Sequence, residues 1–360
     1  MTQLDIVDVG HTYTHGVDEE RWALKPLELT FEAGKTYALV GPSGCGKTTL
    51  LNILSGLVRP SQGQVLFDGA DVTALPTRAR NIAQVFQFPV IYQSMTVYEN
   101  LAFPLQCRRW DKARIDAKVH QVAEALDLYD RLRQPARRLT ADDKQLISLG
   151  RGLVRDDVAA VLMDEPLTVI DPQLKHSLRR KIREITEQFR PTVIYVTHDQ
   201  YEAMSVAQEV LVMKDGRAMQ QGTPEQLFEA PSSTYVGYFI GSPAMNFLTV
   251  DREARGTVTL GGRPLAVAWD IPENAGEAQV GIRPEYVEIV TEPGPNTFPA
   301  TLRGVRDHGP QRVLEIEVAG QLIRAKVPRE NGVPASEEFL VQLPRAKTLP
   351  YADGRLILQS

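Results

Sequence analysis

Residues 41–48 read Gly-Pro-Ser-Gly-Cys-Gly-Lys-Thr and match G-x-x-x-x-G-K-[ST], the pattern of a phosphate-binding loop. The pattern alone has false positives, so its surroundings decide. A short apolar run, 36–40, precedes the loop, and apolar side chains at helical spacing follow it up to Leu57. Between a strand and a helix, the backbone N–H groups of such a loop can surround phosphate oxygens, and the helix N-terminus adds positive potential. The sequence therefore predicts an α/β nucleotide-binding domain.

The loop and the residue after it form the expected nucleotide-binding segment. Lys47 should bridge the outer phosphates, and the Thr48 hydroxyl should ligate Mg²⁺. The residues of this segment are Gly41, Pro42, Ser43, Gly44, Cys45, Gly46, Lys47, Thr48 and Thr49.

Two further apolar runs, 159–163 and 192–196, end in polar residues. Continuous apolar strands alternating with helices indicate a parallel sheet covered on both faces. Asp164 follows the first run and is expected to hold Mg²⁺, while Glu165 is suited to orient or deprotonate an attacking water. His198 follows the second run, where a neighbouring strand would deliver it to the γ-phosphate.

The character of the chain changes after residues 241–243. Short alternating strands with glycine turns replace helical periodicity. Residues 313–318 and 322–327 predict a hairpin, and Gly261-Gly262 is another candidate turn. We expect a boundary near residue 240, with domains at 1–240 and 241–360.

Composition narrows the class of protein. The 360 residues include 40 Lys and Arg against 45 Asp and Glu, so no basic excess points to nucleic acid. Two cysteines cannot form a disulfide framework and suit a reducing compartment. No stretch reaches the roughly 18 apolar residues of a membrane span. A cytosolic protein that acts at a membrane only through a partner is expected.

The order of these features resembles that of the ATP-binding cassette (ABC) ATPases over residues 1–240. The sequence Gly281-Ile-Arg-Pro-Glu285 resembles part of the OB-fold-like (TOBE-type) regulatory domain of sugar-importer ATPases. The resemblance implies an α/β P-loop NTPase cassette with a helical subdomain at about 88–155, followed by an all-β OB-fold-like domain. The elements that carry it are, in order, Tyr13, the loop at 41–48, Gln87, a helical insert, Asp164-Glu165, Asp171 and His198.

The resemblance also assigns roles. Tyr13 would stack on adenine, Gln87 would sense magnesium and the permease, and Asp171 would contact the second cassette. Hydrolysis of ATP would fall to Glu165 and His198. The implied ligands of the cofactor Mg²⁺ are Thr48, Gln87 and Asp164.

The partners implied are those of an importer. Two cassettes face each other head to tail, and each ATP lies between the phosphate loop of one and the signature motif of the other. The surface around Gln87 and residues 88–155 would receive a cytoplasmic helix from two permease subunits, with a periplasmic binding protein acting indirectly. The protein would then be peripheral, at the cytoplasmic face of a bacterial inner membrane, with no nucleic-acid partner.

The signature itself departs from the family pattern Leu-Ser-Gly-Gly-Gln. The aligned residues are Leu139, Thr140, Ala141, Asp142 and Asp143. Both glycines are lost, and two carboxylates stand where a γ-phosphate should dock. At roughly 6 Å and an effective dielectric near 20, each pair of unit charges costs about 3 kcal/mol. This predicts a poor ATP clasp and an asymmetric heterodimer, although the two aspartates could instead cap a helix and turn to solvent.

Residues 81–92 with 95–104, and residues 139–155, are similar to ATP-binding subunits of bacterial glycerol importers. The resemblance implies an ATPase that energises uptake of a small polyol, glycerol. Two alternatives stay open: a homodimeric importer ATPase for a sugar or glycerol phosphate, and a non-transport regulator that binds ATP.

Overall fold

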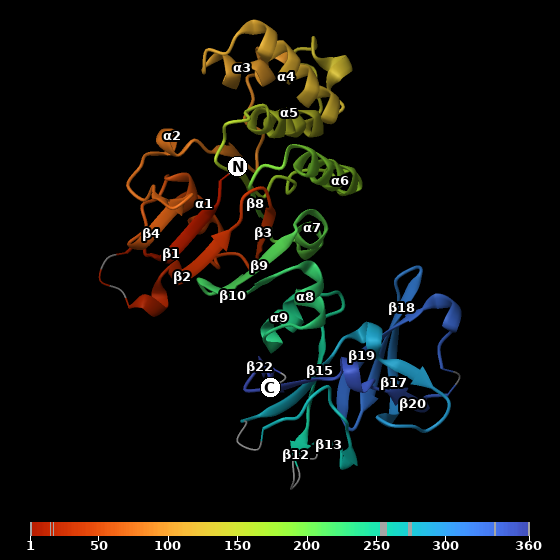
Figure 1. Ribbon diagram of the computed structural model, residues 1–360. Coiled ribbons are helices and arrows are strands. Elements are labelled where there is room, and N and C mark those ends of the chain that lie inside the picture. The colour runs from red at the N-terminus through yellow and green to blue at the C-terminus, as the bar shows by residue number, and fades with distance from the viewer. Residues whose placement is uncertain are drawn as a thin grey trace. The chain divides into compact units, whose positions relative to one another are not determined.

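The computed structural model describes residues 2–14, 16, 18–252, 258–272, 276–334 and 336–358 (Figure 1). The chain divides into two compact units, Met1–Pro224 and Glu225–Ser360. The division after Pro224 lies on the N-terminal side of the boundary expected near residue 240. The physical reason is that the helices α8 (Pro224–Glu229) and α9 (Thr234–Phe239) are bonded to the β-rich part of the chain.

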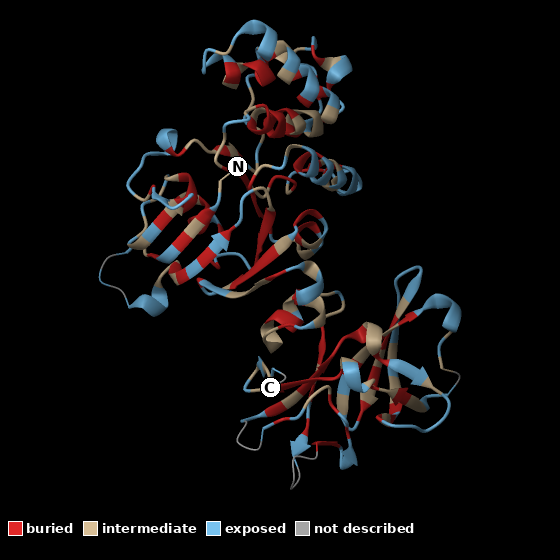
Figure 2. Cartoon of the chain, viewed as in Figure 1, coloured by how far each residue is buried: buried red, intermediate tan, exposed pale blue. Residues whose placement is uncertain are grey.

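The first unit is built on a six-stranded sheet in the order β10-β9-β3-β8-β7-β6. Neighbours from β9 to β6 are parallel, whereas β10 is antiparallel to β9. All residues of β3 and β8 are buried, as continuous apolar runs predict, and Figure 2 shows the buried strands in red. The strands are β3 (Thr36–Val40), β6 (Ala83–Val85), β7 (Val161–Asp164), β8 (Val193–Val196), β9 (Glu209–Lys214) and β10 (Arg217–Gly222).

A second, antiparallel sheet in this unit has the order β2-β1-β4-β5. Its strands are β1 (Leu4–His11), β2 (Leu24–Phe31), β4 (Gln62–Phe67) and β5 (Ala70–Asp71). The helices of the unit are α1 (Lys47–Ser55), α2 (Thr77–Arg80), α3 (Val97–Gln106), α4 (Lys112–Ala125), α5 (Ala141–Leu153), α6 (Pro172–Phe189) and α7 (Gln200–Val206).

The helices α3, α4 and α5 pack on one another around buried side chains such as Val119 and Ile147. Gly150 permits this packing, because an added Cβ would lie 2.6 Å from a Leu101 methyl and 2.7 Å from a Leu126 methyl. Helix α4 ends at Ala125, since Asp127 takes a left-handed conformation with φ of 56°.

The second unit consists of α8, α9 and antiparallel sheets, consistent with an OB-fold-like domain. One sheet has the order β16-β20-β17-β18-β19, and it contains the predicted hairpin, closed where Val318 pairs with Gln321. The predicted turn at Gly261-Gly262 joins β13 to β14. The strands are β11 (Asn246–Thr249), β12 (Asp251–Arg252), β13 (Val258–Leu260), β14 (Arg263–Pro264), β15 (Ala278–Ile282), β16 (Glu288–Val290), β17 (Thr297–Asp307), β18 (Gln311–Val318), β19 (Gln321–Pro328), β20 (Glu338–Gln342), β21 (Leu349–Ala352) and β22 (Arg355–Leu356).

Within the sequence Gly281-Ile-Arg-Pro-Glu285, Arg283 has a structural role: it attaches α8 and α9 to the rest of the second unit. Its side chain is 2% exposed, and its guanidinium donates hydrogen bonds to four carbonyl oxygens at the ends of α8 and α9. Burial lowers the pKa of Arg283 to about 10. The guanidinium therefore binds two helix C-termini, where the orphan carbonyls and the helix dipole both favour a cation. Those carbonyls belong to Leu227, Phe228, Gly237 and Ile240.

Candidate functional site

The phosphate-binding loop leaves β3 at Gly41 and enters α1 at Lys47. Two of its glycines are required by close approach of other backbone. A Cβ at Gly41 would lie 2.3 Å from the carbonyl oxygen of Met213, and one at Gly46, whose φ is +103°, would lie 2.7 Å from that of Ala23. The loop is thus fixed against its surroundings in a conformation that favours glycine.

Lys47 is buried inside the curve of this loop, with 6% of its surface exposed. Its Nζ donates to the carbonyl oxygens of Gly41, at 2.8 Å, and Pro42, at 3.0 Å. A phosphate oxygen would be a stronger partner for this ammonium than these neutral carbonyls, because both groups would then be charged. The neighbouring Cys45 is also buried, and burial raises the pKa of its thiol.

Glu165 and His198 come together at the carboxyl ends of β7 and β8. Glu165 Oε2 lies 3.1 Å from His198 Nδ1 and accepts a hydrogen bond from Thr168 Oγ1 at 3.0 Å. The backbone N–H of Glu165 donates to the carbonyl oxygen of Val196 in the adjacent strand at 2.9 Å. The φ of Glu165 is +46°. About half of the His198 side chain is exposed. A carboxylate and an imidazole in contact at a sheet edge can accept and donate protons at a bound ligand.

Asp164, the last residue of β7, lies half-buried beside this pair. Burial, and secondly repulsion from Glu165, raise the pKa of the Asp164 carboxyl, while the ammonium of Lys47 opposes the rise. A cation would stabilise the ionised carboxylate. Within the described residues no three His, Cys, Asp or Glu side chains are grouped for metal binding. The oxygen donors of Thr48, Gln87 and Asp164 are of the kind that Mg²⁺ accepts together with phosphate and water.

Tyr13 lies next to the start of α1. Its hydroxyl is 3.3 Å from Thr49 Oγ1. Its ring packs edge-on against the ring of His11, with 4.5 Å between the ring centres. Because 64% of Tyr13 is exposed, the ring is accessible for stacking on a base, which is worth roughly 1–3 kcal/mol.

Gln87 is partly buried and follows β6 by two residues. It belongs to residues 86–92, called the 86–92 segment below, whose exposed side chains include Phe88, at 67%, and Val90, at 55%. Asp171 lies elsewhere in the first unit, as the N-cap of α6, where its Oδ1 accepts from the backbone N–H of Gln173 at 2.9 Å.

The variant signature forms the start of α5. Leu139 is buried, Ala141 is the first helical residue, and Thr140 caps the helix by accepting from the backbone N–H of Asp143. The Asp143 carboxylate forms an ion pair with Arg131, while Asp142 has no ion pair with any residue that the structure describes. One of the two expected free carboxylates is therefore compensated. Sequence reasoning missed Arg131, because no local pattern relates it to a residue twelve positions later.

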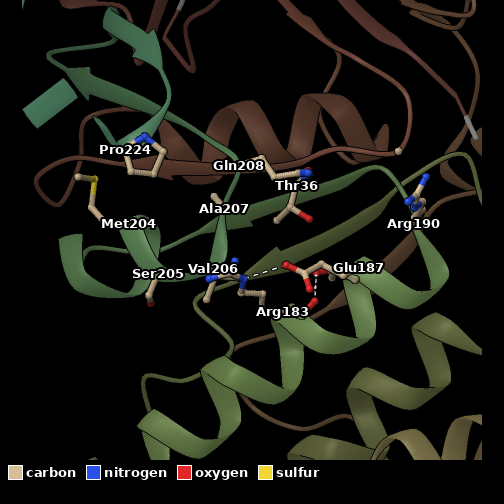
Figure 3. A pocket seen from close by; sticks show the side chains of 12 residues that line it. Thr36, Arg183, Glu187, Arg190, Met204, Ser205, Val206, Ala207, Gln208 and Pro224 are labelled. Carbon is tan, nitrogen blue, oxygen red and sulfur yellow. Dashed lines mark hydrogen bonds and ion pairs between the residues drawn. The ribbon is translucent and has the colours of Figure 1, made fainter. Parts of the chain in front are cut away.

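A pocket of about 630 Å³ lies at the amino ends of strands of the six-stranded sheet (Figure 3). Glu165 and His198 lie at the carboxyl ends. Thr36, the first residue of β3, and Gln208, just before β9, line the pocket together with Arg183 and its ion-pair partner Glu187. None of its 12 lining residues belongs to the predicted site. The pocket is therefore separate from the residues expected to bind nucleotide.

The model of the "ABC transporter" family matches residues 24–168. The chain is 36% identical over 359 residues to the sn-glycerol-3-phosphate import ATP-binding protein UgpC of Jannaschia sp., covering 98% of this chain and 99% of that one. It is 38% identical to the trehalose/maltose import ATP-binding protein MalK of Thermococcus litoralis, covering 89% of each. Among solved structures it is similar to cbiO1 of Clostridium perfringens, part of the ABC transporter complex cbiONQ. That likeness has a TM-score of 0.58 and 25% identity, and covers 63% of this chain and 90% of that one.

Proposed function

Because the chain belongs to the family of ATP-binding subunits of ABC importers for carbohydrates, we propose that it hydrolyses ATP to energise uptake of a small polyol, glycerol, through a membrane permease. The observation that carries the chemistry is the contact of Glu165 with His198, beside Asp164 at the ends of parallel strands.

In the proposed reaction, Lys47 and the backbone N–H groups of the loop hold the outer phosphates, and Tyr13 stacks on the base. Glu165 orients the attacking water and accepts its proton, since Oε2 is already fixed by Thr168 and His198. His198 then donates from its ring to the γ-phosphate oxygens. Thr48, Gln87 and Asp164 would hold Mg²⁺, which neutralises phosphate charge when bound.

The 86–92 segment is the proposed docking site for a cytoplasmic helix of the permease. Support comes from four large side chains of this segment that are exposed, since clustered exposed apolar side chains are typical of protein interaction sites: Phe86, Phe88, Val90 and Tyr92. Within the described part of the chain, no helix combines the length and apolar character that a membrane crossing requires. The proposed assembly contains two cassettes and two permeases at the cytoplasmic face of a bacterial inner membrane, with a periplasmic binding protein acting from the other side.

We further propose an asymmetric pair of cassettes, with Asp171 of this subunit at the contact between them. Support comes from Asp142, whose carboxylate lies on the first turn of α5 and has no ion pair among the described residues. The alternative is a homodimer that imports glycerol phosphate or a sugar. It is favoured by the ion pair of Asp143 with Arg131 and by the names of the relatives above.

Restoring the family signature tests the asymmetry. The double variant Asp142→Gly, Asp143→Gln should change ATP turnover of the assembled complex by less than about twofold, because turnover in the proposed asymmetric pair takes place at the other face, between the phosphate loop of this subunit and the signature of its partner. Phosphate release at saturating ATP measures it. A rise well beyond twofold would place this face in an active site and favour the homodimer. So would a stable ATP-bound homodimer of isolated Glu165→Gln protein in gel filtration.

Uptake assays test the solute. Cells lacking this protein should lose most uptake of labelled glycerol and regain it when the protein is restored, because permeases of this class depend on ATP hydrolysis. Labelled sn-glycerol-3-phosphate, maltose and trehalose serve as the parallel substrates. Unchanged glycerol uptake together with lost uptake of another solute would replace glycerol by that solute.

A further inference from the structure

Two side chains of α5 fasten the 86–92 segment, and the proposed hydrolysis uses neither of them. Gln145 is 4% exposed and donates from Nε2 to the carbonyl oxygen of Phe86 at 3.3 Å. Arg151 donates from Nη1 to the carbonyl oxygen of Val90 at 2.7 Å, and its guanidinium lies 4.6 Å from the centre of the Tyr92 ring. Six residues of helix separate the two attachments by roughly 9 Å, so the segment cannot easily pivot about either one.

The helix that holds this segment also begins with the variant signature, because Thr140 is its N-cap. At its other end Gly150 fits so closely against Leu101 and Leu126 that α5 cannot slide along α3 and α4 without repacking. A displacement of the 86–92 segment would therefore move α5, and the signature with it, as one piece.

Burial of the Gln145 amide has a free-energy cost that an apolar residue at this position would not have. The Oε1 of Gln145 is buried and has no hydrogen-bond partner among the residues that the structure describes, which is unfavourable by roughly 1–3 kcal/mol. An apolar side chain of similar size would avoid that cost and still fill the space between α5 and the strand β6. The amide is thus better explained by its bond to the segment than by the stability of the fold.

We propose that Gln145 and Arg151 are positioning residues that transmit docking of the permease on the 86–92 segment to the signature end of α5. The inference rests on the proposed docking site. It adds that the two side chains determine how strongly ATP hydrolysis depends on the permease, without contacting nucleotide.

The test uses the assembled complex in lipid vesicles, with variants Gln145→Leu and Arg151→Met. Solute taken up per ATP hydrolysed should fall about fivefold or more, as expected for loss of a coupling free energy above 1 kcal/mol. The KM for ATP should stay unchanged. The Tm of Gln145→Leu should not fall, because one hydrogen bond and one unsatisfied oxygen disappear together. Arg151→Lys, which keeps a donor for Val90, should recover part of the coupling.

The matched control is Gln121→Leu, the same change at an exposed position of α4, and it should behave as the unmodified protein. Unchanged coupling in Gln145→Leu and Arg151→Met would overturn the inference. So would parallel losses of coupling and Tm, which would show a structural role. A wild-type complex without ATP-driven uptake would instead contradict the proposed function itself.

Discussion

Replacing Glu165 with glutamine should lower ATP turnover of the assembled complex by about 10²–10⁴-fold, the range expected for loss of a general base. Glutamine matches glutamate in size and can still accept the hydrogen bond that Thr168 donates at 3.0 Å. It cannot take up the proton of the attacking water. Binding of ATP should persist, since Lys47 and the loop are untouched. Phosphate release and equilibrium binding of labelled ATP measure the two quantities.

The control for this variant is Glu187→Gln, the same chemical change on α6. Glu187 lines the pocket at the opposite ends of the strands and pairs with the exposed Arg183, so turnover should be unchanged. Retained turnover in Glu165→Gln would mean that the active phosphate site of the complex belongs to the partner cassette. Lost ATP binding would mean that Glu165 supports the loop rather than the chemistry.

The parts of the site that could be predicted from the sequence are those in which neighbouring residues determine the geometry. The run 36–40 is a buried strand and its loop is continuous with it, so one stretch of sequence specifies strand, turn and helix. His198 and Glu165 are 33 positions apart, yet each stands within two residues of the end of an apolar strand. Because parallel strands end at the same edge of a sheet, their contact at 3.1 Å could be anticipated.

The rest depends on contacts between distant residues that no local pattern reveals. Arg131 reaches Asp143 only because a short 3₁₀ turn at Tyr129–Arg131 follows α4. Gln145 reads as one more polar residue of α5, and only the structure places it under the carbonyl of Phe86. The unit boundary at Pro224 follows from Arg283, a residue almost 60 positions further on.

That arginine leads to the second large effect, on stability. Arg283→Met should destabilise the second unit by at least about 3 kcal/mol, because the carbonyls of Leu227, Phe228 and Ile240 would lose this donor, at roughly 1–3 kcal/mol each, whereas Gly237 keeps the N–H of Met245. Arg283→Lys should recover only part of the loss, since one ammonium cannot reproduce the planar fork. Calorimetry of the full chain, comparing the Tm of the second unit, measures both variants.

Arg303→Met is the comparison that separates burial from charge. Arg303 lies on β17 with about half of its side chain exposed, paired with Glu317 at 2.9 Å. An exposed pair of this kind contributes up to about 1 kcal/mol, so its loss should barely shift the Tm. Equal shifts for Arg283→Met and Arg303→Met would show that water replaces the guanidinium at the helix ends. The sequence Gly281-Ile-Arg-Pro-Glu285 would then need another explanation than the attachment of α8 and α9.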